Sequence, residues 1–189
     1  GSGVGKTYIA SAIVENCLNP NYNSQGKLTE GKDKYDVDLE FVPIHPSFSY
    51  EDLVSGISIQ TEDGSVTFKY EDKLFLSLLK RANNSWKNGE DKKFFLILDD
   101  IGRGAISGIL GDMLPLIEPH GHGTYKVTLK DKTSVWITPN VYIIATRSTT
   151  VDSVEKVNYG FFRHFYEKNI DNDFRYMSDN ANVAYSDYD

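Results

Sequence analysis

The run Gly1-Ser2-Gly3-Val4-Gly5-Lys6-Thr7 at the start of the chain constrains the fold more than any other segment. Closely spaced glycines let consecutive backbone N–H groups turn tightly around an anion. A helix that follows such a loop aims its positive end at the same point. In this pattern the lysine reaches the β- and γ-phosphates and the threonine hydroxyl binds Mg²⁺. We therefore predict that residues 1–7 hold the phosphates of a nucleotide and that Thr7 is a magnesium ligand.

The glycine pattern is incomplete at its beginning. Its first glycine would lie five positions before Gly5, outside the sequence, together with the strand that normally feeds the loop. We therefore expect a domain truncated at its start. Residues Tyr8 to Val14 form an amphipathic pattern, so we expect a helix from Lys6 to about Cys17.

A second signature, Phe94-Phe95-Leu96-Ile97-Leu98-Asp99-Asp100, follows about ninety residues later. An apolar run of this kind predicts a strand buried on both faces in a parallel sheet. Ligands bind at the carboxyl end of such strands. Asp99 is thus the expected partner of Mg²⁺ or of its water, and Asp100 the candidate that polarises an attacking water.

The rest of the sequence alternates between strand and helix patterns, which predicts an α/β fold with a parallel sheet flanked by helices and with β-hairpin insertions. Strands are expected at 39–44 and 140–146. Hairpins are expected from 57–61 with 65–70, and from 125–129 with 134–138, and Pro43 suggests a sheet edge or a strand end. Helices are expected after a capping box at Ser49 and over 71–86, 106–117 and 158–167.

Composition excludes several classes of protein. The net charge of −7 argues against a broad, sequence-independent grip on nucleic acid. The single cysteine excludes a disulfide framework, and no run of eighteen apolar residues predicts a membrane span. A cytoplasmic protein is expected.

The order of these motifs resembles the AAA+ module, and in detail the McrB family, the GTP-driven motor subunits of modified-cytosine-dependent restriction systems. The resemblance runs from Gly1 to about Phe165. It is carried most specifically by Ile44-His45-Pro46-Ser47-Phe48-Ser49-Tyr50-Glu51-Asp52-Leu53, which is similar to the family's His-x-Ser-Tyr-Ser-Tyr-Glu-Asp-Phe segment. The runs 99–104 and 140–144 match the family's Asp-Glu-Ile-Asn-Arg-Ala and strand segments.

The resemblance also bears on the roles of Arg103, Arg163, Asp100 and Ser148. Arg103 matches an arginine that contacts the nucleotide or a neighbouring subunit, and Arg163 is the candidate arginine finger offered in trans. Such a finger contributes a factor of about 10³–10⁵ in rate. Asp100 stands where the family has Glu, and Ser148 stands where the family has its sensing Asn. Both departures predict weakened hydrolysis with binding retained.

The resemblance also implies an architecture and partners. Residues 1–168 would form the AAA+ nucleotide-binding domain, with a polar tail or the start of a further segment at 169–189. The implied cofactors are Mg²⁺ and GTP, with ATP as the other candidate. The implied partners are further copies in a homo-oligomeric ring, a hexamer, and an McrC-like nuclease subunit, with DNA bound through domains outside this segment.

Two alternatives remain open at this point. One is a MoxR-like AAA+ chaperone that uses ATP. The other is a hydrolysis-impaired scaffold that binds nucleotide without turnover, because of Asp100 and Ser148.

Overall fold

The computed structural model describes residues 5–18, 36–62, 64–117, 123–129, 132–148, 161 and 165–168. Its centre is a three-stranded parallel sheet in the order β1-β4-β7, made of β1 (Asp36–Pro43), β4 (Lys92–Asp99) and β7 (Val141–Ala145). The predicted α/β fold with a parallel sheet is confirmed. Pro43 is the last residue of β1, at an edge of the described sheet, as its missing N–H requires.

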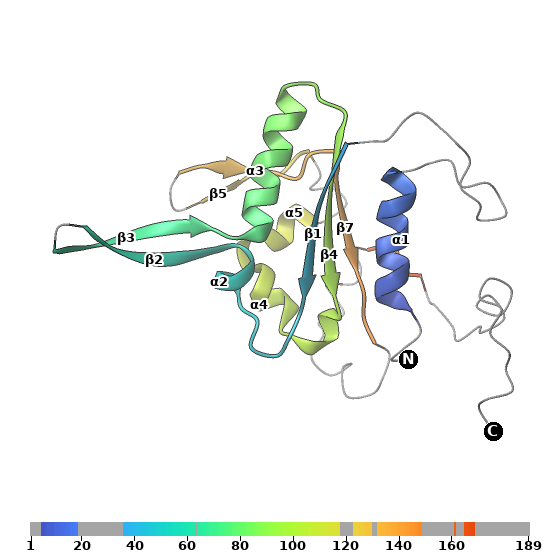
Figure 1. The fold of residues 1–189 in the computed structure, drawn as a ribbon, viewed down its shortest axis with the longest axis horizontal. Coiled ribbons are helices and arrows are strands. Elements are labelled where there is room, and N and C mark those ends of the chain that lie inside the picture. Colours follow the sequence, from blue (N-terminus) through green and yellow to red (C-terminus); the bar gives the residue numbers. More distant parts are fainter. Residues whose placement is uncertain are drawn as a thin grey trace, which may run out of the picture.

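Helices cover both faces of this sheet (Figure 1). Helix α1 (Lys6–Leu18) lies on one face, and α3 (Leu74–Lys87), α4 (Ile106–Leu110) and α5 (Leu114–Ile117) lie on the other. The alternation of side chains along β4 divides its apolar residues between two cores. Phe94, Leu96 and Leu98 face the larger core beside α3, whereas Phe95 and Ile97 face α1.

The two cores differ greatly in size. On the α1 face, the buried residues are Ala10 and Val14 with Phe95 and Ile97. The opposite core also includes a residue from late in the chain, because Phe161 is buried there and packs against Phe165 at a centroid distance of 4.9 Å. Most of the apolar burial therefore lies on the α3 side.

Helix α3 is joined to the edge strand β1 by a bidentate ion pair. The Nε and Nη2 atoms of Arg81 each donate to Asp38 at 2.9 Å, and Nη2 also donates to Glu40 at 2.8 Å. Asp38 and Glu40 are two residues apart, so they lie on the same side of the strand. Their hydrogen bonds and charges raise the pKa of Arg81, Asp38 contributing most.

Two hairpins interrupt the alternating pattern, as predicted. The longer one consists of β2 (Ser55–Glu62) and β3 (Ser65–Asp72), and it extends well away from the body of the molecule (Figure 1). It follows the short helix α2 (Tyr50–Leu53), where the Asp52 carboxylate accepts hydrogen bonds from the Ser49 amide and hydroxyl. The capping box predicted at Ser49 thus has its expected carboxylate.

Two predicted helices differ from those in the structure. Glu71 and Asp72 belong to β3, so α3 begins only at Leu74. The helix predicted over 106–117 is broken into α4, the 3-10 turn η2 (Gly111–Met113) and α5, because Gly111 has a φ of 48°, which a continuous α-helix does not accommodate.

The second hairpin is shorter than predicted. It is reduced to β5 (Val127–Thr128) and β6 (Ser134–Val135). The Asn83 side chain of α3 donates to the Trp136 carbonyl at 2.8 Å, so that carbonyl bonds to a helix instead of extending the ladder.

Of the predicted helix at 158–167, only Phe161 and residues 165–167 are described, and the expected tail at 169–189 lies outside the described residues. None of the helices in the described ranges is long and apolar enough to cross a bilayer.

Candidate functional site

The candidate site lies at the carboxyl edge of the sheet. Because β4 and β7 are parallel and paired from Phe94–Val141 to Leu98–Ala145, the residues that follow them emerge side by side. Asp99 ends β4, and Thr146 follows β7 directly. The first turn of α1 reaches the same edge, bringing Thr7 to these two residues.

Two hydroxyl groups converge on one carboxylate oxygen of Asp99. The Thr7 hydroxyl donates to Asp99 Oδ1 at 2.8 Å, and the Thr146 hydroxyl donates to the same oxygen at 2.6 Å. Thr7 and Asp99 are 92 residues apart in the sequence. The fold therefore brings together the two residues that the sequence assigned to magnesium.

Thr146 also holds the backbone beyond β4. Its hydroxyl accepts a hydrogen bond from the Asp100 N–H at 2.9 Å, and its carbonyl accepts one from the Ile101 N–H at 2.9 Å. Sequence reasoning placed Thr146 at the end of a buried strand but gave it no role. A hydroxyl residue directly after a strand adjacent to the acidic one is the signal that could have identified it.

Asp100 has a left-handed backbone, with φ 58° and ψ 49°. This conformation is uncommon for a residue with a side chain, although Asp tolerates it better than most. Its Oδ2 atom forms an ion pair with Arg103 Nε at 2.5 Å across one turn of η1 (Ile101–Arg103). The structure thus joins two of the predicted catalytic residues to each other.

Of the predicted phosphate loop, the structure describes the chain from Gly5 onward. Gly5 has a φ of +77°, which favours glycine, and its carbonyl accepts from the Ile9 N–H at 2.9 Å as α1 begins. Lys6 is the first residue of that helix. Gly1 to Val4 and the predicted arginine finger Arg163 lie outside the described residues.

Ser148 follows Thr146 by two residues and is therefore at the same edge of the sheet. Between them, Arg147 forms an ion pair with Glu167, which ties the end of the sheet to the last described segment. The role of Ser148 near the nucleotide stays a prediction.

The donors at this edge fit magnesium better than a softer metal. The Thr7 hydroxyl and the Asp99 carboxylate are hard oxygen ligands, and Mg²⁺ fills the rest of its octahedron with water and phosphate oxygens. Within the described ranges no group of three or more His, Cys, Asp or Glu residues could hold a metal by itself. A cation here would depend on a bound nucleotide for most of its ligands.

Comparison with known proteins agrees with the resemblance seen in the motifs. The chain is 28% identical over 168 residues to the type IV methyl-directed restriction enzyme EcoKMcrB subunit of Escherichia coli K12. The match covers 86% of this chain and 32% of that protein, so the chain spans about a third of the length of its relative. No protein-family model matches the sequence.

Among solved structures, an inferred ATPase of Cytophaga hutchinsonii superimposes with a TM-score of 0.43 at 12% identity, covering 94% of this chain and 52% of that one. That similarity is too low to assign a fold or a function. The sequence match shows that this chain, with an acidic strand at the centre of a parallel α/β sheet, is similar to McrB.

Proposed function

We propose that the chain is an AAA+ nucleoside triphosphatase module that binds Mg²⁺ with GTP and hydrolyses it. One observation carries the proposal: the Thr7 hydroxyl lies 2.8 Å from Asp99 Oδ1, although the two residues are far apart in the sequence. A hydroxyl at the start of a P-loop helix and a carboxylate at the end of the acidic strand are the pair that holds magnesium against the β- and γ-phosphates.

The site residues then have distinct roles. Residues 1–5 surround the phosphates with backbone N–H groups, and Lys6 contacts the β- and γ-phosphates. Thr7 and Asp99 would hold Mg²⁺, which would supply positive charge beside the phosphate oxygens. Asp100 and Ser148 orient the attacking water.

The binding half of this proposal can be tested by calorimetry. Titration of the chain with GTP and with ATP, each with Mg²⁺, should show binding that is weakened at least about tenfold by Thr7→Ala or Asp99→Asn, since each removes a charge-assisted contact of about 1.5–3 kcal/mol. Thr124→Ala and Asp91→Asn are matched controls, because both residues are exposed and outside the site. Equal affinity in the Thr7→Ala, Asp99→Asn and control variants would refute the proposed site, and tighter binding of ATP would refute the GTP preference.

A second candidate function is supported by the ion pair between Asp100 and Arg103. An arginine paired with this carboxylate occupies an oxygen that would otherwise orient the attacking water. In this second function the module binds nucleotide and holds an assembly together without turnover. The double variant Asp100→Glu with Ser148→Asn separates the two: a sharp rise in phosphate release supports the scaffold, whereas an unchanged rate supports a module that already hydrolyses.

We extend the proposal to the assembly. Similarity to McrB supports a homo-oligomeric ring, a hexamer, in which Arg163 of one copy and Arg103 of its own or a neighbouring copy act on the nucleotide, with an McrC-like nuclease as the partner subunit. Domains outside this segment would contact DNA. Light scattering with Mg²⁺–GTP tests the oligomeric state, and phosphate release with and without the candidate nuclease tests the partner. A chain that stays monomeric, with a rate of phosphate release that the nuclease does not change, would contradict this assembly.

A further inference from the structure

The β2–β3 hairpin carries an exposed apolar face, remote from the nucleotide site. Cross-strand pairing sets Ile57 opposite Tyr70, Ile59 opposite Phe68 and Thr61 opposite Val66. Directly paired residues of an antiparallel ladder point to the same face. The large members of this set are more than half exposed: Ile57 57%, Ile59 67%, Val66 59%, Phe68 69% and Tyr70 52%.

The opposite face of the same hairpin is polar. Ser58 pairs with Lys69, and Gln60 pairs with Thr67. This alternation is the pattern of a strand pair with one buried face, yet its apolar side is in solvent. A two-stranded ribbon is marginally stable alone, and contiguous exposed apolar patches of this kind mark interaction sites.

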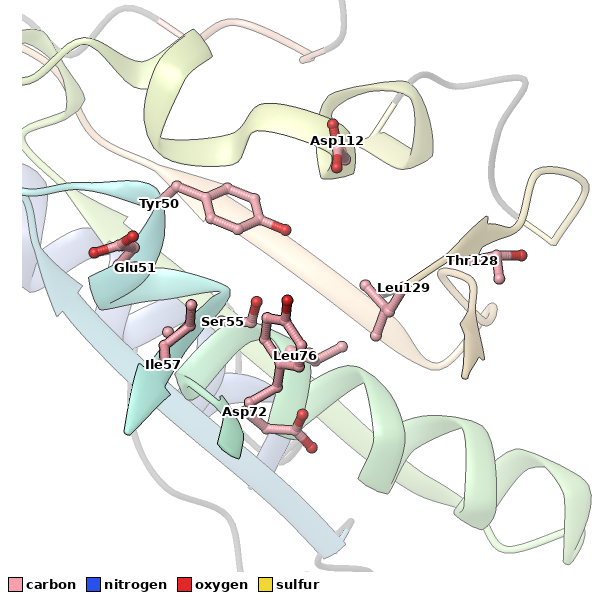
Figure 2. Close-up of a pocket in the computed structure, with 11 residues that line it drawn as sticks. Tyr50, Glu51, Ser55, Ile57, Asp72, Leu76, Asp112, Thr128 and Leu129 are labelled. Atoms are coloured by element: carbon pink, nitrogen blue, oxygen red, sulfur yellow. The ribbon is translucent and has the colours of Figure 1, made fainter. Parts of the chain in front are cut away.

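A pocket of about 170 Å³ continues the apolar face at the base of the hairpin (Figure 2). Ile57 and Tyr70 belong to both the face and the pocket lining, and Tyr50, Asp72 and Asp112 add polar groups. In Figure 2 the Tyr50 hydroxyl points into the space below Asp112, whereas Glu51 points away. The pocket is thus continuous with the apolar face and acidic in character.

The charges in the pocket favour a cation. Asp72 pairs with Lys80 at 2.7 Å, but Asp112 has no ion-pair partner among the described residues. Tyrosine rings beside a carboxylate bind ammonium and guanidinium groups through both charge and the ring face. Burial, and secondarily the negative charge of Asp112, raise the pKa of Tyr50, which keeps its hydroxyl neutral.

We infer that this apolar face and the pocket at its base bind an extended segment of a partner protein that carries alternating apolar residues and a Lys or Arg that enters the pocket. A third strand would pair with an open edge of the hairpin, as in β-strand addition, and would set its own apolar side chains beside those of the apolar face. This interaction uses no residue of the proposed nucleotide site and is independent of it.

Charge argues against a second copy of the chain as the occupant. The base of the face carries Asp72 and Asp112. Two identical faces packed base to base would set acid against acid. A basic partner segment is complementary to this base, and the net charge of −7 favours it further.

The test uses the full chain and a random dodecamer peptide library displayed on phage. Peptides selected on the chain should contain alternating apolar residues with Lys or Arg. Binding of the best synthetic peptide, followed by fluorescence anisotropy, should weaken at least tenfold in Ile59→Ser/Phe68→Ser. It should weaken severalfold in Asp112→Asn and in high salt, which screens charge.

The matched control is Gln60→Ser/Thr67→Ser, which changes a directly paired couple on the polar face and should leave affinity unchanged. Circular dichroism of each variant verifies that the fold is retained. Failure to enrich face-dependent peptides, enrichment of acidic ones, or an equal loss in the control overturns the inference. Self-association that Ile59→Ser/Phe68→Ser abolishes would also overturn the inference. Competition for the face by a single-stranded oligonucleotide would do the same.

Discussion

At the scale of single residues, Thr146 fixes the position of the acidic pair. Its hydroxyl donates to Asp99 Oδ1 and accepts from the Asp100 N–H, and only 7% of the residue is exposed. The Thr146 hydroxyl therefore orients the Asp99 carboxylate, which is the expected magnesium ligand, and also holds the backbone of Asp100.

We predict that Thr146→Val lowers the free energy of unfolding by about 1–3 kcal/mol, because it leaves a buried N–H without an acceptor and a carboxylate short of one donor. Urea denaturation measures this change. Thr146→Ser retains the hydroxyl and should recover most of the loss. A valine variant as stable as the serine variant would show that the two hydrogen bonds contribute nothing.

Asp52 provides a prediction about pH. The Ser49 hydroxyl, and secondarily the Ser49 N–H, lower the pKa of the Asp52 carboxyl. A lowered pKa in the folded state means that the contribution of this cap is present above the ordinary pKa of Asp and is lost as the pH falls through the lowered one. Acid should therefore weaken the start of α2.

Ser49→Ala tests this cause directly. The pKa of Asp52 should rise toward its ordinary value but stay below it, because the backbone N–H at position 49 remains. A titration followed by the NMR shift of the carboxyl carbon gives both values. An unchanged pKa would mean that the hydroxyl is not the main donor.

At the scale of elements, Gly111 explains why the apolar periodicity of 106–117 does not give one helix. Its φ is +48°, and a Cβ there would lie 2.8 Å from Cδ2 of the Tyr50 ring. The apolar periodicity indicates which side chains of the segment face the core. That burial pattern is preserved across the break, since Ile109, Met113 and Leu116 are all buried. The periodicity contains no information on the backbone turn between them.

We predict that Gly111→Ala destabilises the protein by about 1–3 kcal/mol, since it combines an unfavourable φ with a clash. Gly108→Ala is the matched control within α4, where a Cβ meets nothing within 4 Å and an alanine favours the helix by up to about 1 kcal/mol. Thermal unfolding of both variants should show opposite signs. Equal effects would contradict the strained conformation at Gly111.

The elements that sequence reasoning located correctly are those with a strong local signal. The apolar run before Asp99 and the Asp-Gly turn at 63–64 predicted β4 and the β2–β3 hairpin. The second hairpin was overestimated, because the Asn83 side chain that binds Trp136 is a contact over 53 residues. Contacts between residues so far apart in the chain produce no recognisable pattern in the sequence of either segment.

At the scale of the whole molecule, the convergence of Thr7 and Asp99 was foreseeable because a P-loop helix and an acidic parallel strand end at one edge of a sheet. The part played by Thr146, and the ion pair between Asp100 and Arg103, were not. Both depend on the path of the chain after the strands end, which no pattern in the sequence specifies.

The unequal cores predict unequal local stability. Helix α1 contacts the sheet through the small cluster of Ala10 and Val14, whereas α3 buries Phe75, Leu78 and Leu79 in the large core. Regions with few buried apolar contacts open at lower free energy than the global transition. We predict that the amides of α1 exchange with deuterium well before those of α3 and β4.

Hydrogen exchange with mass spectrometry measures the order in which these elements exchange. The same measurement with bound nucleotide tests the proposed function. Since α1 begins at Lys6 and Thr7, Mg²⁺ with GTP should slow exchange in α1 much more than in α3, because binding stabilises the state that holds the phosphates. Thr7→Ala should keep the slow exchange of α3 and remove the protection of α1. If the amides of α1 and α3 exchange at the same rate without nucleotide, the two cores unfold as one cooperative unit. The prediction that α1 opens separately would then be wrong.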